Sequence, residues 1–186
     1  IESDRGQYDA PREVFWASGA CMLVRSEVFR RLGGFDGDFF AHMEEIDFCW
    51  RAQLAGYRIR VEPRSTVFHV GGGTLPNNSP QKIYLNFRNN LCMLFKNLSP
   101  GTFWPVLFSR MVLDGMAALV FLVQGHPDFF KKVFRAHIDF HRQRKSLHEK
   151  RRAIQRHRVA RPHGILRNSI ILLHAFGYRT FDKVMR

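Results

Sequence analysis

Along residues 43–57, apolar side chains recur every three or four positions, the spacing that places them on one face of an α-helix. The apolar face holds Met43, Ile46, Trp50, Leu54 and Tyr57. We therefore predict a helix that opens near Glu44. A second face carries Asp47 and Arg51 four residues apart, with Glu44 along the same stripe, so those two acids are expected to have a cationic neighbour. Glu45 falls on neither face.

Three shorter segments have the pattern of β-strands. Residues 16–24 are apolar and few in number, as in a buried strand. Residues 58–61 and 66–70 alternate between apolar and polar positions, and Val67 and His69 would share one face of the second of these strands.

The same region contains residues typical of turns and helix caps. Ser26 offers an N-cap for a helix that Gly33 and Gly34 end. Asp36 and Asp38 have the spacing of a metal motif, but they lie in the turn after the two glycines, where they are expected to cap the following segment.

A longer helix is predicted from Ser79 and Pro80, with serine as N-cap and proline at the first helical position, to about Asn97. Its buried stripe is predicted to hold Ile83, Phe87, Leu91, Leu94 and Leu98. Tyr84 and Arg88 lie one turn apart on a different face, where they would reach a nucleotide phosphate. The alternative is a solvated Arg88.

The best candidate for a domain boundary is Ser99-Pro100-Gly101, after which a long apolar stretch begins. A helix over residues 102–123 would be about 33 Å long. Pro105 interrupts the stretch, as do Arg110 and Asp114, which are spaced to pair with each other. The uninterrupted part is too short to span a bilayer, so we predict a helix packed on the protein or lying in the membrane interface.

The net charge of +13 is distributed unevenly along the chain. Residues 1–98 carry 12 Lys/Arg against 11 Asp/Glu, a net of +1, whereas residues 99–186 carry 17 against 5, a net of +12. Residues 141–161 contain nine of these basic side chains and a single acid, Glu149. They predict a surface for anionic lipid headgroups, with a solvated helix as the alternative. Nucleic-acid binding is a rival use of this charge, but the chain holds no base-recognition motif.

The composition is that of a folded protein. Hydrophobic residues make up 45% of the 186 positions, enough for one domain or two small ones. Cys21, Cys49 and Cys92 are odd in number, far apart and without metal-ligand spacing, so we expect reduced, buried thiols in a cytoplasmic setting. Further helices are predicted over residues 129–140 and, as a short apolar stretch, 165–176.

Glu45 is the leading candidate for chemistry. A general base needs an ionised carboxylate that is free to accept a proton beside a cleft, and a glutamate in a first helical turn next to a loop can fill that role. The structural alternative is that acids in a first turn complement the positive end of the helix dipole.

Several short motifs occur in a fixed order between about Phe15 and about Asn90. They are Trp16-Ala-Ser-Gly-Ala-Cys-Met-Leu-Val-Arg25, Gly33-Gly34-Phe35-Asp36, Glu44-Glu45-Ile46-Asp47-Phe48-Cys49-Trp50-Arg51, Gly56-Tyr57, Pro63 and His69. Together they resemble the back half of family 2 glycosyltransferases, in the version of bacterial rhamnosyltransferase-like enzymes that build surface polysaccharides. The resemblance implies an α/β chain with a GT-A fold that transfers a sugar from a nucleotide-sugar to an acceptor hydroxyl, with inversion.

The resemblance also implies roles for individual residues. In the family an acidic pair at this helix start reads Glu-Asp, with the second member as catalytic base. Glu44 and Glu45 occupy those places, so Glu45 inherits the base role on an arm one methylene longer. The segment that contains Trp16 and Gly19 would border the donor sugar and the acceptor, and Trp16 would stack on a sugar ring or anchor the core.

The remaining implied roles concern the donor. His69 would ligate the divalent metal, Mg or Mn, that holds the donor pyrophosphate, and Gly71 and Gly72 would bring backbone N–H groups to phosphate oxygens. Arg88 would match an Arg of the family that precedes an Asn. Without the family, His69 is expected to be a hydrogen-bonded structural residue and the glycines a flexible loop.

The family's N-terminal nucleotide-binding half and its Asp-any-Asp motif should precede Trp16, and we expect that half to be absent here. Residues 1–98 would be the acceptor-side half of the catalytic domain, and 99–186 a basic helical extension that associates with the membrane. We therefore predict part of an inverting glycosyltransferase, inactive alone, acting on a glycan or lipid-linked acceptor at the inner face of the plasma membrane. The alternative is a non-enzymatic basic module that binds nucleic acid or an anionic membrane.

Overall fold

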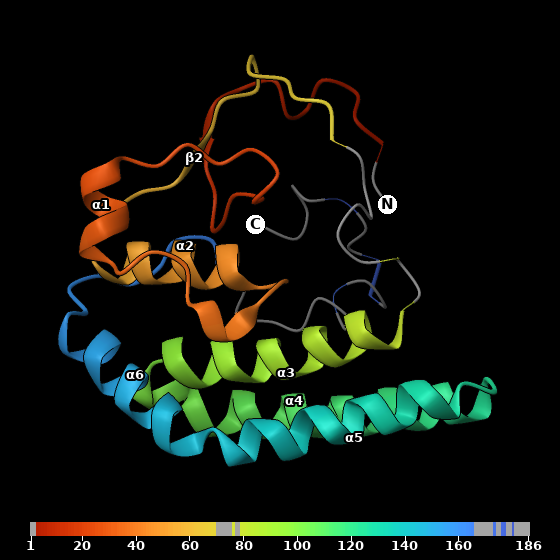
Figure 1. The fold of residues 1–186 in the computed structure, drawn as a ribbon. Helices are drawn as coiled ribbons and strands as arrows, with labels where there is room; N and C mark the ends of the chain where they lie inside the picture. Colours follow the sequence, from red (N-terminus) through yellow and green to blue (C-terminus); the bar gives the residue numbers. More distant parts are fainter. Residues whose placement is uncertain are drawn as a thin grey trace.

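The computed structural model describes residues 3–69, 76 and 79–165, together with residues 173, 176, 177 and 180. Figure 1 shows helix α2 above α3, and α3 above α4 and α5, with α6 alongside. The elements are β1 (Arg12–Glu13), α1 (Ser26–Arg31), a short 3-10 helix η1 (Gly37–Phe39), α2 (Glu44–Leu54), β2 (Arg60–Val61), α3 (Pro80–Asn97), α4 (Pro100–Val123), α5 (Pro127–Arg142) and α6 (Arg144–Arg156).

Helix α1 ends at the two glycines, as predicted. Gly33 and Gly34 both have left-handed backbones, with φ of 75° and 67°. The Gly34 N–H donates to the Phe29 carbonyl at 2.8 Å, which satisfies an otherwise unpaired carbonyl of the last turn. The start differs from the prediction by one position, because Ser26 is the first helical residue and Arg25 is the N-cap.

Helices α2 and α3 begin where the sequence predicts and form the centre of the core. Trp50 and Leu54 of α2 are buried, and Met43 and Ile46 pack against the same cluster. The Ser79 hydroxyl accepts a hydrogen bond from the first turn of α3 and caps that helix.

Helix α3 is buried over a wider surface than a single stripe. Leu91 and Leu98 are buried as predicted, but Ile83, Phe87 and Leu94 are only partly so. Other sides of the helix are also enclosed, including Leu85, Asn89, Met93 and Lys96. The cause is its position between α2 on one side and α4, α5 and α6 on the other.

One hydrophobic cluster joins the two parts of the chain across residue 98. Phe95 of α3 lies with its ring centroid 5.1 Å from that of Phe103 in α4 and 5.7 Å from that of Phe140 in α5. Leu147 of α6 belongs to the same cluster. The helices after residue 98 therefore help to enclose α3, whereas the separate roles predicted for the two parts stay a prediction.

Two strand predictions are wrong for the residues that the structure describes. Residues 16–24 are irregular and mostly exposed, with Leu23 fully accessible, and residues 66–69 are likewise irregular, with Phe68 fully accessible. A strand needs a neighbour for its backbone N–H and C=O groups, and apolar residues alone do not supply one.

The sheet that does form is small. Strand β1 pairs antiparallel with β2, with Arg12 opposite Val61 and Glu13 opposite Arg60, so the strand predicted over 58–61 is confirmed in part. Over the described ranges the chain is mainly helical, with much less sheet than the predicted α/β class implies.

Helix α4 is apolar and largely exposed. Its buried residues, Phe103, Leu107, Asp114 and Ala118, follow one stripe. The predicted pair is confirmed, because an Arg110 nitrogen lies 2.5 Å from Asp114 Oδ1. Among the described residues it is the one helix that could cross a bilayer, judged by length and composition alone. The length of α4 therefore does not decide between a membrane-spanning helix and the predicted packed or interfacial one, and the prediction stays open.

Candidate active site

Glu45 lies in the first turn of α2, directly after a loop of unusual backbone. Phe40, His42 and Met43 all have positive φ, at 63°, 68° and 74°. Such values are uncommon for residues other than glycine. Met43 is the N-cap of the helix, so this loop sets the direction in which the first turn leaves.

Three polar atoms in and beside this turn lack partners. His42 Nε2, Glu44 Oε2 and Glu45 Oε2 are each shielded from solvent without a hydrogen-bond partner among the described residues. Buried polar atoms are normally hydrogen-bonded, so each of the three could gain a partner from a polar ligand. His42 was not predicted from the sequence, because nothing local distinguishes it from a turn histidine.

Glu45 has the electrostatic environment of a base. Burial raises the pKa of its carboxyl, the neighbouring Glu44 raises it further, and backbone hydrogen bonds and His42 lower it. Within the described part of the chain, no Arg or Lys forms an ion pair with either glutamate. The cationic neighbour predicted for Glu44 is therefore wrong there, whereas Glu45 is unpaired as predicted.

The segment predicted to border donor and acceptor does pass beside Glu45. A Cβ placed on Gly19 would lie 3.8 Å from the Cβ of Glu45, in ordinary contact. Trp16 is 42% exposed, so it is not a buried core anchor. Cys49, one turn along α2 from Glu45, is buried as predicted, and that burial raises the pKa of its thiol. Cys92 is also buried, but the prediction is wrong for Cys21, which is exposed because residues 16–24 do not form a buried strand.

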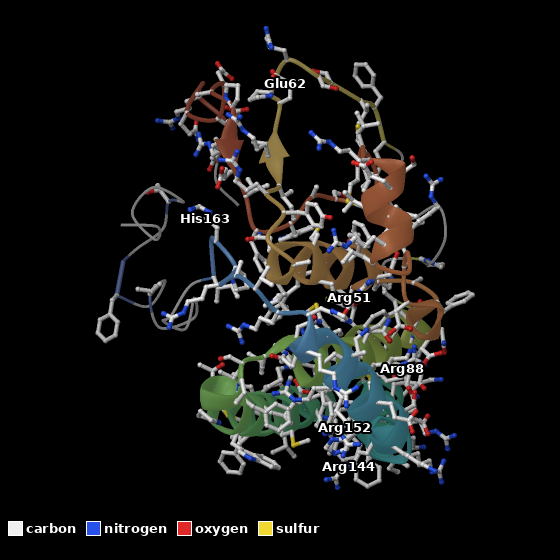
Figure 2. The ribbon with its side chains drawn as sticks, turned by 90° about the vertical axis from the view of Figure 1, so that its left-hand side faces the viewer. Arg51, Glu62, Arg88, Arg144, Arg152 and His163 are labelled. Carbon is white, nitrogen blue, oxygen red and sulfur yellow. The ribbon has the colours of Figure 1, made fainter. Side chains whose placement is uncertain are left out.

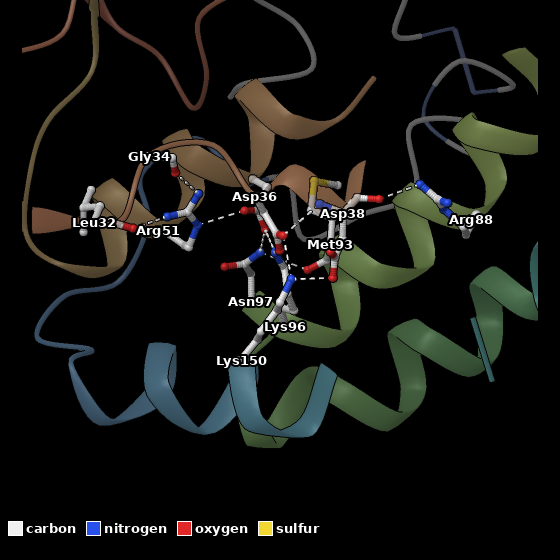
Figure 3. Close-up of polar contacts among 11 residues, drawn as sticks. Leu32, Gly34, Asp36, Asp38, Arg51, Arg88, Met93, Lys96, Asn97 and Lys150 are labelled. Carbon is white, nitrogen blue, oxygen red and sulfur yellow. Dashed lines mark hydrogen bonds and ion pairs between the residues drawn. The ribbon is translucent and has the colours of Figure 1, made fainter. Parts of the chain in front are cut away.

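Arg88 and Asn89 of α3 hold the loop before Glu45. The Asn89 side-chain amide, fully buried, donates to the carbonyls of Phe39, Ala41 and His42 at 3.0, 2.8 and 2.8 Å. Arg88 donates to the Asp38 carbonyl at 2.8 Å, a contact drawn in Figure 3. It also donates to the amide oxygen of its neighbour Asn89 at 2.9 Å. The geometry gives Arg88 a structural task, and its role toward the donor stays a prediction.

A buried ion cluster lies further along α2. Arg51 donates to Asp47 at 2.8 Å, as predicted, and to the carbonyls of Leu32 and Gly34 (Figure 3). Asp47 is fully buried. It also forms an ion pair with Lys96 at 3.0 Å and accepts a hydrogen bond from the Asn97 amide at 2.7 Å.

The cluster continues to the turn before η1. Asp36 caps η1 through the Asp38 N–H, as predicted, and accepts hydrogen bonds from Lys96 at 2.5 Å and Lys150 at 2.6 Å. Burial alone would raise the pKa of Asp36, but the two lysines lower it to about 2. Lys150 also pairs with Asp38 at 2.7 Å, so α6 is joined to this turn.

Of the residues predicted to bind metal and phosphate, the structure describes His69, which is exposed. Gly71 and Gly72 lie outside the described residues, as does most of the predicted helix at 165–176. In the described ranges no three His, Cys, Asp or Glu side chains are grouped as a metal site requires. A single imidazole does not fit Mg²⁺ or Mn²⁺, which need several oxygen ligands.

Helices α4 and α6 carry exposed apolar and exposed basic side chains respectively. On α4, Trp104, Phe108, Met116 and Leu119 are between 58% and 69% exposed. The exposed basic residues of α6 are Arg144, Lys145, Arg152 and Arg156. Arg144 and Arg152 lie in the lower part of Figure 2, where the lower helices are, away from Glu62.

Residues 1–82 match the sequence model described as Glycosyl transferase family group 2. A 56-residue segment is 43% identical to Rhamnosyltransferase WbbL of Escherichia coli K12, covering 30% of this chain and 21% of that protein.

Two further relatives show the same partial similarity. A 58-residue segment is 41% identical to the N-acetylglucosaminyl-diphospho-decaprenol L-rhamnosyltransferase of Mycobacterium tuberculosis, covering 31% of this chain and 19% of that protein. Another, of 79 residues, is 31% identical to the Low-salt glycan biosynthesis hexosyltransferase Agl10 of Haloferax volcanii, covering 42% and 26%. No solved structure matches the chain. The resemblance in the motifs is confirmed over a segment that spans about a fifth to a quarter of these relatives.

Proposed function

Because residues 1–82 match the model of glycosyl transferase family group 2, we propose that the protein is an inverting glycosyltransferase of bacterial surface polysaccharide synthesis. It would move a sugar from a nucleotide-sugar to an acceptor hydroxyl. The observation that carries the proposal is the carboxylate of Glu45, which forms no ion pair with a described residue and has one oxygen without a hydrogen-bond partner. The names of the relatives support rhamnose as the first donor sugar to test and a glycan or lipid-linked acceptor.

The Glu45 carboxylate accepts the proton of the acceptor hydroxyl. The hydroxyl oxygen attacks the anomeric carbon in line, the bond to the nucleoside diphosphate breaks, and that group leaves with the bonding electrons. Burial helps, because a carboxylate whose pKa is raised holds a proton more strongly. A divalent metal in the intact enzyme stays a prediction, and no step here depends on it.

The test is Glu45→Gln in the full-length protein, with sugar transfer and nucleoside diphosphate binding both measured. We expect turnover to fall by about 100-fold or more, with binding unchanged, because the amide cannot accept the proton. Glu44→Gln is the matched control in the same turn, and we expect a smaller loss. Turnover within about tenfold of wild type for Glu45→Gln would refute the assignment.

We further propose that helices α4 and α6 hold the protein on the inner face of an anionic membrane. The exposed aromatic and aliphatic side chains of α4 would enter the headgroup region, while the basic side chains of α6 contact lipid phosphates. Arg151 of α6 lies 4.4 Å from the ring centroid of the buried Phe103 in α4, so the two helices are in contact at that point.

Vesicle binding tests the membrane proposal. Replacing Arg144, Lys145, Arg152 and Arg156 by Gln should weaken binding to vesicles of anionic lipid by about 100-fold at low salt, at about 1 kcal/mol per basic residue or somewhat less. The matched control, Arg58→Gln with Arg64→Gln, alters exposed basic residues outside these helices. Preference for duplex DNA over vesicles at equal salt would favour the non-enzymatic alternative.

A further inference from the structure

The loop that leads into α2 contains two kinds of strained backbone. Phe40 has φ 63° and ψ −59°, and the Ala41 N–H donates to the Phe39 carbonyl at 2.7 Å, which is the rare γ-turn. His42 and Met43 then follow with positive φ and no glycine to relieve it. Strain of this kind persists only where surrounding structure holds it in place.

A single side chain supplies most of that restraint. The Asn89 amide nitrogen donates to three carbonyls of the loop, at Phe39, Ala41 and His42. Its oxygen accepts from the Arg88 Nε, which fixes the amide with its nitrogen toward the loop. An aspartate of the same shape has no N–H to offer, and three carbonyl oxygens would face a carboxylate.

We propose that Asn89, oriented by Arg88, is a positioning residue that fixes the direction of the Glu45 carboxylate. The link is short, because the third carbonyl it holds belongs to His42, and the helix that carries Glu45 starts from Met43. This inference rests on the proposed function. It assigns to Asn89 a part in turnover without contact with substrate.

The first test is Asn89→Asp in the full-length protein, with Asn97→Ala as the matched control. Asn97 is an equally buried amide on the same helix that donates to Asp47 and Met93 and does not touch the loop. We expect kcat to fall about 100-fold in Asn89→Asp, as for a misplaced catalytic group, with nucleoside diphosphate binding unchanged. Asn97→Ala should lose stability without this change in kcat.

Two readouts separate positioning from general loosening. Hydrogen exchange of residues 39–46 should speed up in Asn89→Asp but not in Asn97→Ala. The acid limb of the pH–rate profile should move to lower pH in Asn89→Ser, which adds no charge, because Glu45 would lose the burial that raises its pKa. Glu44, His42 and Cys49 interact electrostatically with the carboxyl and are not substituted in any variant. If Asn89→Asp does not fold, Asn89→Ser retains one donor and should show the same changes at reduced size.

The outcomes are separable from those of the proposed function. If hydrogen exchange of residues 39–46 is unchanged in Asn89→Asp, the proposal that Asn89 holds the loop is overturned, whatever the activity of Glu45→Gln. Faster exchange with unchanged kcat and an unchanged pH profile overturns its connection to turnover. An active Glu45→Gln variant refutes the base itself, while the exchange comparison still measures what Asn89 holds.

Discussion

Helix α2 carries carboxylates in two opposite settings within one turn. Asp47 is fully buried, forms ion pairs with Arg51 and Lys96, and accepts a hydrogen bond from Asn97. Glu45, two residues earlier, is part-exposed, has an oxygen without a partner, and forms no ion pair with a described residue. The first arrangement satisfies a charge and holds elements together, whereas the second leaves a charge available. The difference shows that acid content alone says little, and that each carboxylate must be judged by its partners.

The largest expected effect is on the buried cluster. Lys96 is 1% exposed and pairs with both Asp36 and Asp47. Lys96→Met should lower the free energy of unfolding by about 3–5 kcal/mol, because the buried Asp47 and the partly buried Asp36 lose a shared cation. Urea unfolding would measure it. Lys150→Met, whose side chain is 31% exposed, is the control and should cost clearly less. Equal costs would contradict the importance assigned to burial.

A smaller effect is expected from pH. The pKa of Asp36 is about 2 in the folded protein against an ordinary 3.8. Because the folded value is lower, its contribution is complete above about pH 4 and is lost as the pH falls through 2, and it amounts to roughly 2 kcal/mol. Unfolding measured from pH 6 to pH 2 should show that loss. Asp36→Asn should flatten this part of the curve relative to wild type, and an unchanged slope would contradict the assignment.

The smallest effect should come from Glu45 itself. Glu45→Gln is expected to leave the free energy of unfolding at pH 7 unchanged or to raise it by less than about 1 kcal/mol, because no ion pair is lost and burial disfavours the charge. Asp47→Asn is the counterpart two residues away, and it should destabilise by at least about 2 kcal/mol. Thermal or urea unfolding of both variants measures the two changes. A larger loss of stability for Glu45→Gln than for Asp47→Asn would contradict the difference drawn between the two carboxylates.

Local signals in the sequence predicted the helices well. The Gly33-Gly34 stop, the Ser79 cap and the spacing of Trp50 and Leu54 depend on nearest neighbours in the chain, and the structure confirms them. The Asp47–Arg51 pair is of the same kind. Asp47 also pairs with Lys96 and accepts a hydrogen bond from Asn97, 49 and 50 residues away, and neither contact has a signal in the local sequence.

The strands and the loop before Glu45 could not be predicted in the same way. Residues 16–24 have a strand's composition, but pairing partners are a property of the whole sheet. The positive φ values at Phe40, His42 and Met43 could not be predicted, because no glycine occurs at these positions to indicate them. The Arg88-Asn89 pair can be seen in the sequence, but its contacts with the loop before Glu45, about 50 residues away, cannot.

Lys150 connects with Asp36 and Asp38 across more than 110 positions of sequence. The family match stops at residue 82, inside α3, so the inherited unit and the folding unit are not the same length. A shortened chain that ended with the match would lack Lys96 and Lys150, so Asp36 would lose both of its lysines and Asp47 would keep Arg51 alone. The helices that follow the matched segment therefore supply cations that its acidic residues use.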